Sequence, residues 1–571
     1  MRCMKAILVK TVATALALVS AAEARAAGVT DEARCTSLAA DKADGIDDAV
    51  FRPLAKAPPA GPFQAPNPPN LMIPAHCEVH GMLDARTGID GQHYAIRYHL
   101  RMPTNWNGRF FFQGGGGTNG VVGDAYGPVG GGRMPAIAMG YAVVSQDSGH
   151  DNQRNNDPDR AGVAVFGGDP VARANYGGTS LKRVADTAKK VVGRFYSRAI
   201  EKSYFFGCSK GGEEGMVFAQ RYPSEFDGIV AAAPGFALPR AAVAQVWDVQ
   251  VFGALTKAPG EVHADFRKLA SVFSDAQLAL VRDAVLAACD GDDGAKDGIV
   301  GRFDRCTLSR VKPELDRRLC ASGQTESCLS PAQEAALDRS MEGPRDAAGK
   351  QIYSDWAWDG GVGAFGWRMW KLGSAMMPAL NVSTGGASIS MIFTVPPTPV
   401  HDDPNSYFER EMQLDIAREA GKIYATNAQF PRSAWTDVSA HSADLSAFRA
   451  HGGKLIVPHG ASDPVFSIND TLAWYRRARA KEGPVLDSFL RVFAVPGMNH
   501  CGMGPATDNY DAFAALVAWV ENGRTPDRII ATAGPGSPWP GRTRPLCPYP
   551  KVAVYNGHGS LEEAANFTCR S

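Results

Sequence analysis

The sequence predicts an α/β fold, in which a mostly parallel β-sheet is covered by helices and interrupted by a large inserted lid. Three observations lead to this prediction. The chain has 571 residues, more than one simple core accommodates. Short apolar stretches typical of strands alternate with helical patterns in its first part. These strand signals then stop for about two hundred residues before they resume, as expected for an insertion.

The composition is that of an ordinary globular enzyme. Hydrophobic residues make up 45% of the chain and charged residues 21%. The formal net charge at pH 7 is zero. We therefore expect neither nucleic acid nor an anionic membrane surface as a partner.

Residues 1–26 have the layout of a signal peptide. Basic residues up to Lys10 precede an apolar run from Thr11 to Ala22, and small residues follow it. The run is too short to span a bilayer, and a core helix, the alternative, does not explain the flanks. No cysteine lies at the expected cleavage point, which argues against a lipid anchor. We expect a secreted or periplasmic protein without a stable membrane anchor.

Residues 27–235 are expected to form the first part of the core. Strand and helix signals alternate here, which favours a parallel sheet with helices on its faces. We predict strands at His93–Arg101, Arg109–Phe112, Tyr141–Ser145, Ser203–Phe206 and Gly228–Ala232, and helices at Ser180–Ser197 and about Glu213–Arg221.

Residues 236–443 are expected to form the inserted lid, and residues 444–571 the second part of the core. The lid segment is rich in Trp, Gly and Pro and contains helix-like stretches. Strand signals resume at Lys454–Pro458 and Phe489–Val495, followed by a helical pattern at Asp511–Asn522. One α/β domain with an inserted lid is the simplest interpretation.

The cysteines indicate a disulfide framework. Of eleven, Cys3 would leave with the signal peptide, and the remaining ten suit five bridges in an exported protein. A zinc site is the alternative, but no C-x-x-C pair occurs.

The strongest motif is Gly207-Cys208-Ser209-Lys210-Gly211, a G-x-S-x-G sequence between a strand candidate and a helix candidate. A nucleophilic serine on a sharp turn needs small flanking residues so that strand and helix can approach. This context, which a chance match would lack, identifies Ser209 as the candidate nucleophile.

A serine hydroxyl needs a base, which an acid in turn orients. In hydrolases with this motif the acid and then the histidine follow the serine. Asp463 follows the strand candidate Lys454–Pro458, and His500 follows Phe489–Val495, so both fit. His459 is the rival base, although it precedes Asp463 and breaks this order.

Backbone N–H groups must stabilise the oxyanion that forms during the reaction. One is expected from Lys210, directly after the nucleophile. The other is expected from the glycine-rich loop Gly114–Gly120. A phosphate-binding loop is the alternative, but no Lys-Ser/Thr pair follows these glycines.

Cys208 and Cys501 flank the candidate nucleophile and base. A bridge between them would tie the two catalytic turns together and contribute about 4–5 kcal/mol in the chain-entropy model. It would also hold Ser209 and His500 within reach of each other. The alternative is two unrelated buried thiols.

The stretch Asp290–Ile299 packs four carboxylates and three glycines into ten residues. Hard oxygen ligands on a turn-forming backbone suit calcium, although the EF-hand glutamate is missing. A solvated acidic turn is the alternative. Cys289 and Cys306 bracket the loop and would pin it shut. Its distance from Ser209 in the sequence favours a structural role over a catalytic one.

Cys208-Ser209, Asp463 and His500-Cys501 together resemble the tannase and feruloyl esterase family, and the similarity extends from about Cys35 to Cys569. Within the family it is closest to the branch that hydrolyses mono(2-hydroxyethyl) terephthalate, on stretches such as Arg86–Gly91 and Arg542–Pro550. The resemblance implies an α/β-hydrolase core whose lid sets specificity.

The resemblance also implies roles for individual residues. It places the oxyanion N–H groups on Gly117 and Lys210, and apolar substrate contacts on Leu238, Trp370 and Phe466. It implies structural Ca²⁺ and no organic cofactor. The implied calcium ligands are the side chains of Asp290, Asp293 and Asp297 and the carbonyls of Ala295 and Ile299; the implied bridges are Cys208–Cys501, Cys35–Cys77, Cys289–Cys306, Cys320–Cys328 and Cys547–Cys569.

One departure from that branch affects the substrate. Its members bind the terephthalate carboxylate through a lid arginine with a phenylalanine shortly after it, but Leu380–Ala387 contains neither. Loss of a bidentate arginine contact favours a broader or different aromatic ester. We therefore expect a serine carboxylesterase for feruloyl, galloyl or terephthaloyl esters, with a terephthalate-releasing hydrolase as the alternative. A non-catalytic, calcium-stabilised binding protein is less favoured because all three triad residues are present.

Overall fold

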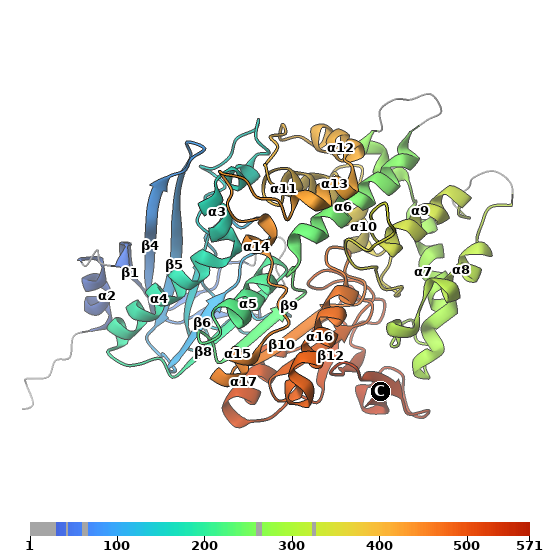
Figure 1. Cartoon of the computed structure of the whole chain (residues 1–571). Helices are drawn as coiled ribbons and strands as arrows, with labels where there is room; N and C mark the ends of the chain where they lie inside the picture. The colour runs from blue at the N-terminus through green and yellow to red at the C-terminus, as the bar shows by residue number, and fades with distance from the viewer. Residues whose placement is uncertain (1–29, 41–43, 60–66, 258–264, 322–326) are drawn as a thin grey trace, which may run out of the picture.

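A nine-stranded sheet is the largest element of the computed structural model, which describes residues 30–40, 44–59, 67–257, 265–321 and 327–571 (Figure 1). The strand order is β1-β4-β5-β7-β6-β8-β9-β10-β11. The six strands from β7 to β11 in this order are parallel, whereas β1, β4 and β5 pair antiparallel. The strands are β1 (Ile46–Arg52), β4 (His76–Thr87), β5 (His93–Pro103), β6 (Arg109–Gln113), β7 (Ala142–Gln146), β8 (Lys202–Cys208), β9 (Gly228–Ala232), β10 (Lys454–Gly460) and β11 (Leu490–Val495).

Helices cover both faces of the sheet. Successive side chains of a strand point to opposite faces, so Phe110 and Phe112 of β6 enter one core while Phe111 enters the other. Burial on both faces explains why the central strands are almost continuously apolar. The core helices are α2 (Asp31–Ala40), α3 (Pro170–Ala174), α4 (Ser180–Tyr196), α5 (Lys210–Arg221), α15 (Ser446–His451), α16 (Ile468–Glu482) and α17 (Ala512–Asn522).

Between β9 and β10, which are neighbours in the sheet, the chain makes a long helical excursion. The described residues of this excursion form no strand of any sheet. Figure 1 shows α6 and the helices α10 to α14 together to one side of the sheet. Its helices are α6 (Leu238–Gly253), α7 (Asp275–Cys289), α8 (Leu308–Asp316), α9 (Pro331–Glu342), α10 (Phe365–Lys371), α11 (Gly386–Met391), α12 (Pro404–Gln413), α13 (Ile416–Lys422) and α14 (Ala434–Val438).

Three two-stranded sheets complete the fold. Two of them follow α17 and pack beside the end of the main sheet, and the third lies in the N-terminal approach. They are β2 (Ala55–Lys56) with β3 (Met72–Ile73), β12 (Ile529–Thr532) with β13 (Thr543–Leu546), and β14 (Val552–Tyr555) with β15 (Phe567–Arg570).

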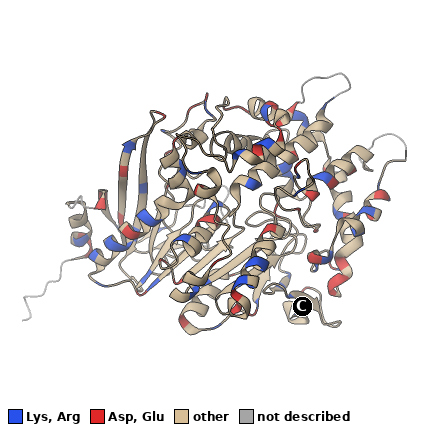
Figure 2. Cartoon of the chain, viewed as in Figure 1, with Lys and Arg blue, Asp and Glu red and all other residues tan. Residues whose placement is uncertain are grey.

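The predicted α/β class is confirmed, and every predicted strand has a counterpart within a few residues. The expected signal peptide lies outside the described residues. Among those residues, no helix combines the length and apolar character that crossing a membrane requires. Basic and acidic side chains are interspersed in the view of Figure 2, in keeping with the zero net charge.

Candidate active site

Ser209 occupies a strained turn between β8 and α5. Its φ of 66° and ψ of −123° lie outside the regions that L-residues favour. Its N–H donates to the carbonyl of Ala232 at 3.1 Å, which ties the turn to the end of β9. A Cβ on Gly207 would lie 2.5 Å from the carbonyl group of Gly211, and one on Gly211 would lie 2.6 Å from the carbonyl oxygen of Gly115. The turn therefore requires both motif glycines.

Asp463 lies just after β10 and is 2% exposed. Its Oδ1 accepts the N–H groups of Val465 and Phe466 at 2.8 and 3.1 Å, and its Oδ2 accepts from Nδ1 of His500 at 2.8 Å. Burial alone would raise the pKa of this carboxyl, but electrostatic attraction to the His500 ring and hydrogen bonds from His459 and His500 lower it overall. Asp463 is thus an ionised acceptor that fixes the His500 ring.

His500 presents its second ring nitrogen away from Asp463. Because a carboxylate can only accept, Nδ1 carries the proton and Nε2 carries a lone pair. This Nε2 is buried and has no hydrogen-bond partner among the described residues. The arrangement suits a general base that receives its proton from a reacting group.

His459, the rival base, lies in β10 and is fully buried. Its Nδ1 contacts the Thr471 hydroxyl at 2.9 Å, and its Nε2 contacts the Phe466 carbonyl at 2.9 Å and Asp463 Oδ2 at 3.3 Å. Both ring nitrogens are therefore engaged. The geometry gives His459 the role of holding the Asp463 loop and favours His500 as the base.

A disulfide between Cys208 and Cys501 brings the two catalytic turns together. Its Cα atoms are 6.1 Å apart, with Ser209 and His500 as the adjacent residues. The other four bridges implied by the family resemblance are also present, which confirms the pairing in full: Cys35–Cys77, Cys289–Cys306, Cys320–Cys328 and Cys547–Cys569.

The predicted oxyanion loop lies against the first turn of α5. The N–H of Gly114 donates to the Phe206 carbonyl at 2.9 Å, which fastens the loop to β8. Lys210 is the first residue of α5, where N–H groups have no partner within the helix. Gly117 is exposed, has a φ of 58°, and leaves open space where a Cβ would be. Within the described part of the chain, neither the Lys210 nor the Gly117 N–H donates to a protein group.

The three predicted apolar contact residues gather around the triad. The rings of Trp370 on α10 and Phe466 lie edge-on to the His500 ring, with centroids 5.9 and 5.4 Å away. Leu238, at the start of α6, joins Phe466 beside Gly235, where a Cβ would meet Phe466 at 2.6 Å and Leu238 at 2.9 Å. The structure therefore places two aromatic rings beside the candidate base, with a leucine close to one of them.

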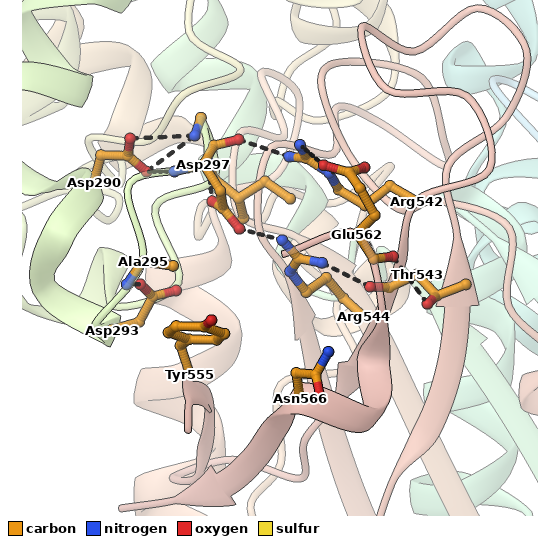
Figure 3. A network of polar contacts seen from close by, with 12 residues as sticks. Asp290, Asp293, Ala295, Asp297, Arg542, Thr543, Arg544, Tyr555, Glu562 and Asn566 are labelled. Carbon is orange, nitrogen blue, oxygen red and sulfur yellow. Dashed lines mark hydrogen bonds and ion pairs between the residues drawn. The ribbon is translucent and has the colours of Figure 1, made fainter. Parts of the chain in front are cut away.

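The acidic loop predicted to bind calcium follows α7 and faces the C-terminal segment (Figure 3). Asp290 Oδ1 accepts the N–H groups of Asp297 and Gly298 at 3.3 and 3.1 Å, and Asp293 Oδ1 accepts that of Ala295 at 3.0 Å. The carboxylate of Asp297 forms an ion pair with Arg544 of β13.

The loop residues fit calcium in donor type, because three carboxylates and buried carbonyls are oxygen ligands. Burial and, to a smaller extent, the charges of Asp297 and Asp290 raise the pKa of Asp293 to about 7, although Arg544 opposes the shift. The three carboxylates are not drawn together within 4.8 Å, since Asp297 turns to Arg544.

Among the described residues, one triplet of metal-binding side chains does meet the 4.8 Å distance: Glu78, His80 and His99. Glu78 already accepts from the guanidinium groups of Arg52 and Arg101. Two arginines beside the carboxylate disfavour a cation, so this triplet is an ion-pair network on β4 and β5.

Sequence reasoning missed two of these residues. Arg544 acts on the acidic loop from 247 positions away, and no local pattern reveals such a contact. The sequence indicates His459 only as a rival base, although its position four residues before Asp463 is a signal for a partner of that carboxylate.

Comparison with known proteins agrees with this geometry. The model of the family described as tannase and feruloyl esterase matches residues 77–570. The mono(2-hydroxyethyl) terephthalate hydrolase of Piscinibacter sakaiensis is 44% identical over 524 residues, covering 87% of this chain and 85% of that protein. An uncharacterised esterase of Xanthomonas campestris is 31% identical, covering 90% and 87% of the two chains.

Solved structures share the fold. Feruloyl esterase B from Aspergillus oryzae superimposes with a TM-score of 0.72 at 24% identity, covering 95% of this chain and 100% of that chain. At this level of identity the likeness concerns the fold, and the family follows from the sequence matches. The chain belongs to the tannase and feruloyl esterase family and is a carboxylic ester hydrolase that acts on aromatic esters.

Proposed function

We propose that Ser209, His500 and Asp463 carry out ester hydrolysis through an acyl-enzyme. The Ser209 hydroxyl attacks the ester carbonyl carbon while His500 Nε2 takes its proton, and the N–H groups of Gly117 and Lys210 bind the oxyanion. Collapse of the tetrahedral intermediate expels the alcohol, which receives the proton from His500. Water then repeats the sequence, releases the aromatic acid and restores the serine.

One observation carries this proposal: His500 is fixed by Asp463 through Nδ1, keeps an unpartnered Nε2, and lies on a turn that a disulfide joins to the Ser209 turn. The disulfide next to both residues supports their proximity. The unfavourable backbone conformation of Ser209 supports its role as the nucleophile, since such strain is retained where function requires it.

Reaction with a fluorophosphonate probe tests the nucleophile. The wild-type protein should lose activity as the probe attaches to Ser209, as mapped by mass spectrometry. Ser209→Ala should lower kcat by at least about 10³-fold while the thermal unfolding midpoint stays unchanged. Undiminished ester hydrolysis by this variant would refute the assignment.

We infer that the substrate places its aromatic acyl group against Trp370, Phe466 and Leu238. Two aromatic rings close to the base suit an aromatic acid. Within the class, we favour feruloyl, galloyl or other aromatic esters over strict terephthalate specificity, because the segment Leu380–Ala387 supplies no arginine for a free carboxylate.

A terephthalate-releasing activity is the second candidate, favoured by the 44% identity to the Piscinibacter hydrolase. A panel of feruloyl, galloyl and terephthaloyl esters compared by kcat/KM separates the two. Dominant turnover of mono(2-hydroxyethyl) terephthalate would show that carboxylate recognition does not need the missing arginine.

We further propose that residues 236–443 act as a lid over this site, that Ca²⁺ stabilises the lid, and that the chain is exported. The excursion supplies Leu238 and Trp370 beside the triad, which supports the lid. The carboxylates of Asp290, Asp293 and Asp297 and the carbonyls of Ala295 and Ile299 would hold the ion as a structural element, away from the reacting groups. Five disulfides support an oxidising compartment.

A further inference from the structure

Three charged side chains of the first turns of α5 are buried beneath the oxyanion loop. Lys210 is 1% exposed, and Glu213 and Glu214 are fully buried. Buried charges are costly unless they are paired. Nζ of Lys210 donates to Oε2 of Glu213 at 2.6 Å and to Oε1 of Glu214 at 3.3 Å. One ammonium therefore pairs with two buried carboxylates, an arrangement that costs stability.

Glu214 reaches from this helix to the glycine loop. Its Oε2 accepts the N–H of Gly115 at 2.8 Å, and its Oε1 accepts from Nδ2 of Asn119 at 2.7 Å. Asn119 in turn accepts the N–H of Gly116 through Oδ1 at 2.8 Å. Two successive loop amides are thus bound by the Glu214–Asn119 pair. The next amide, that of Gly117, has no acceptor among the described residues and is available to a ligand.

The carbonyl of Gly117 is also held. The Tyr176 hydroxyl donates to it at 3.2 Å, and the ring of the same tyrosine lies 4.6 Å from Nζ of Lys210. Helix α5, the loop and Tyr176 therefore form one polar unit. The two predicted oxyanion donors belong to its two sides, Lys210 on the helix and Gly117 on the loop.

We propose that Glu214 is the positioning residue of the oxyanion hole: its carboxylate clamps the glycine loop to α5 and fixes the Gly117 N–H relative to the Lys210 N–H. This inference rests on the proposed function of those two amides. Lys210 then has two roles. Its backbone N–H faces the oxyanion, while its side chain neutralises Glu214, whose charge would otherwise oppose the oxyanion.

A carboxylate suits this position better than an amide. Glu214 accepts from three donors at once, namely Gly115, Asn119 and Lys210. A glutamine has one acceptor oxygen, and its NH₂ group would face another donor. Charge-assisted hydrogen bonds are also roughly twice as strong as neutral ones. Glu214→Gln should therefore loosen the loop without changing the volume of the side chain.

Glu213→Gln is the matched control. Glu213 is as buried as Glu214 and accepts from the same ammonium, but among the described residues it forms no hydrogen bond with the loop. For each variant we would measure kcat and KM on an aromatic ester, the inhibition constant of an aryl boronic acid, and the thermal unfolding midpoint. Boronic acids form a tetrahedral adduct with a reactive serine and place an oxygen in the oxyanion hole.

We expect Glu214→Gln to lower kcat by at least about tenfold, below the 10²–10³-fold cost of removing a donor outright. KM should change by less than about twofold, and boronate affinity should fall in parallel with kcat/KM, because the loss concerns the transition state. Glu213→Gln should keep kcat and boronate affinity within about twofold of wild type.

Asn119→Gly provides a second variant in case Glu214→Gln does not fold. Asn119 has a φ of 58°, which glycine adopts freely, so this change removes only the side chain. It should show the same selective loss of kcat and boronate affinity. Wild-type kcat and boronate affinity in whichever of the two variants folds would overturn the inference. A wild-type protein that neither boronate nor fluorophosphonate inhibits would instead refute the proposed function.

Discussion

At the scale of single residues, burial decides how several charged groups behave. Glu213 is fully buried, and its Oε1 has no hydrogen-bond partner among the described residues. Burial raises the pKa of this carboxyl to about 7, although the Lys210 ammonium opposes the shift. An unfolded glutamate loses its proton near pH 4.3. Between these two pH values the folded protein therefore retains a proton on Glu213 that the unfolded chain releases.

This proton makes stability depend on pH. A carboxyl with a raised pKa in the folded state stabilises the fold fully below its unfolded pKa, and that contribution is lost as pH rises through about 7. We expect Glu213→Gln to flatten this part of the profile, so that its free energy of unfolding improves relative to wild type between pH 5 and pH 8. Urea unfolding at both pH values measures the difference. If the difference in free energy of unfolding between variant and wild type is the same at pH 5 and pH 8, Glu213 is ionised at both pH values.

The residues that sequence reasoning identified carry local signatures. Ser209 lies between glycines, and His500 follows a strand and precedes a cysteine, so the order of the motifs suffices. Glu214 carries no such mark, because Lys-Gly-Gly-Glu-Glu at the start of a helix is typical of a solvated first turn. Its role depends on a loop ninety-nine residues away, a contact that only the fold creates.

At the scale of elements, the acidic loop shows how a segment can depend on distant partners. Arg542 donates to the carbonyl of Asp297 at 2.6 Å, and Arg544 pairs with the carboxylate of the same residue (Figure 3). The segment 542–544 therefore joins the loop to the core. One arginine on three carboxylates leaves charge for a divalent cation.

Calcium should therefore stabilise the folded protein. At 100 times its dissociation constant, an ion that binds only the folded state adds about 2.7 kcal/mol. We expect added Ca²⁺ to raise the thermal unfolding midpoint of the wild-type protein and EGTA to lower it. Neither addition should change the midpoint of Asp293→Asn. Asp283→Asn, on the exposed face of α7, should respond to calcium as wild type does. Equal midpoints with Ca²⁺ and EGTA in the wild-type protein would contradict the proposal.

The central strands were predictable because they are buried on both faces and therefore read as apolar runs. β1 and β4 were not predicted, since they lie at the antiparallel edge of the sheet. β1 has one fully buried residue, Ile46, and β4 ends in exposed polar residues. Strands with one solvated face carry few apolar residues, and a prediction based on apolar runs misses them.

At the scale of the whole molecule, the site is assembled from both ends of a long excursion. Ser209 comes from before residues 236–443, whereas Asp463 and His500 come after them. The parallel pairing of β9 with β10 joins the two halves in the sheet. The Cys208–Cys501 disulfide joins them again at the catalytic turns, across a separation of 293 residues.

Removing this bridge should affect stability and activity together. In the chain-entropy model, a closed loop of this length contributes about 5 kcal/mol, against about 2–3 kcal/mol for a loop as short as that of Cys320–Cys328. We expect Cys208→Ala/Cys501→Ala to lower the unfolding midpoint more than the matched change at Cys320 and Cys328. Only the former should reduce kcat, by about tenfold or more, because displacing catalytic groups by about 1 Å is costly. A double variant at 208 and 501 that loses stability but keeps wild-type kcat would show that the sheet alone aligns Ser209 with His500.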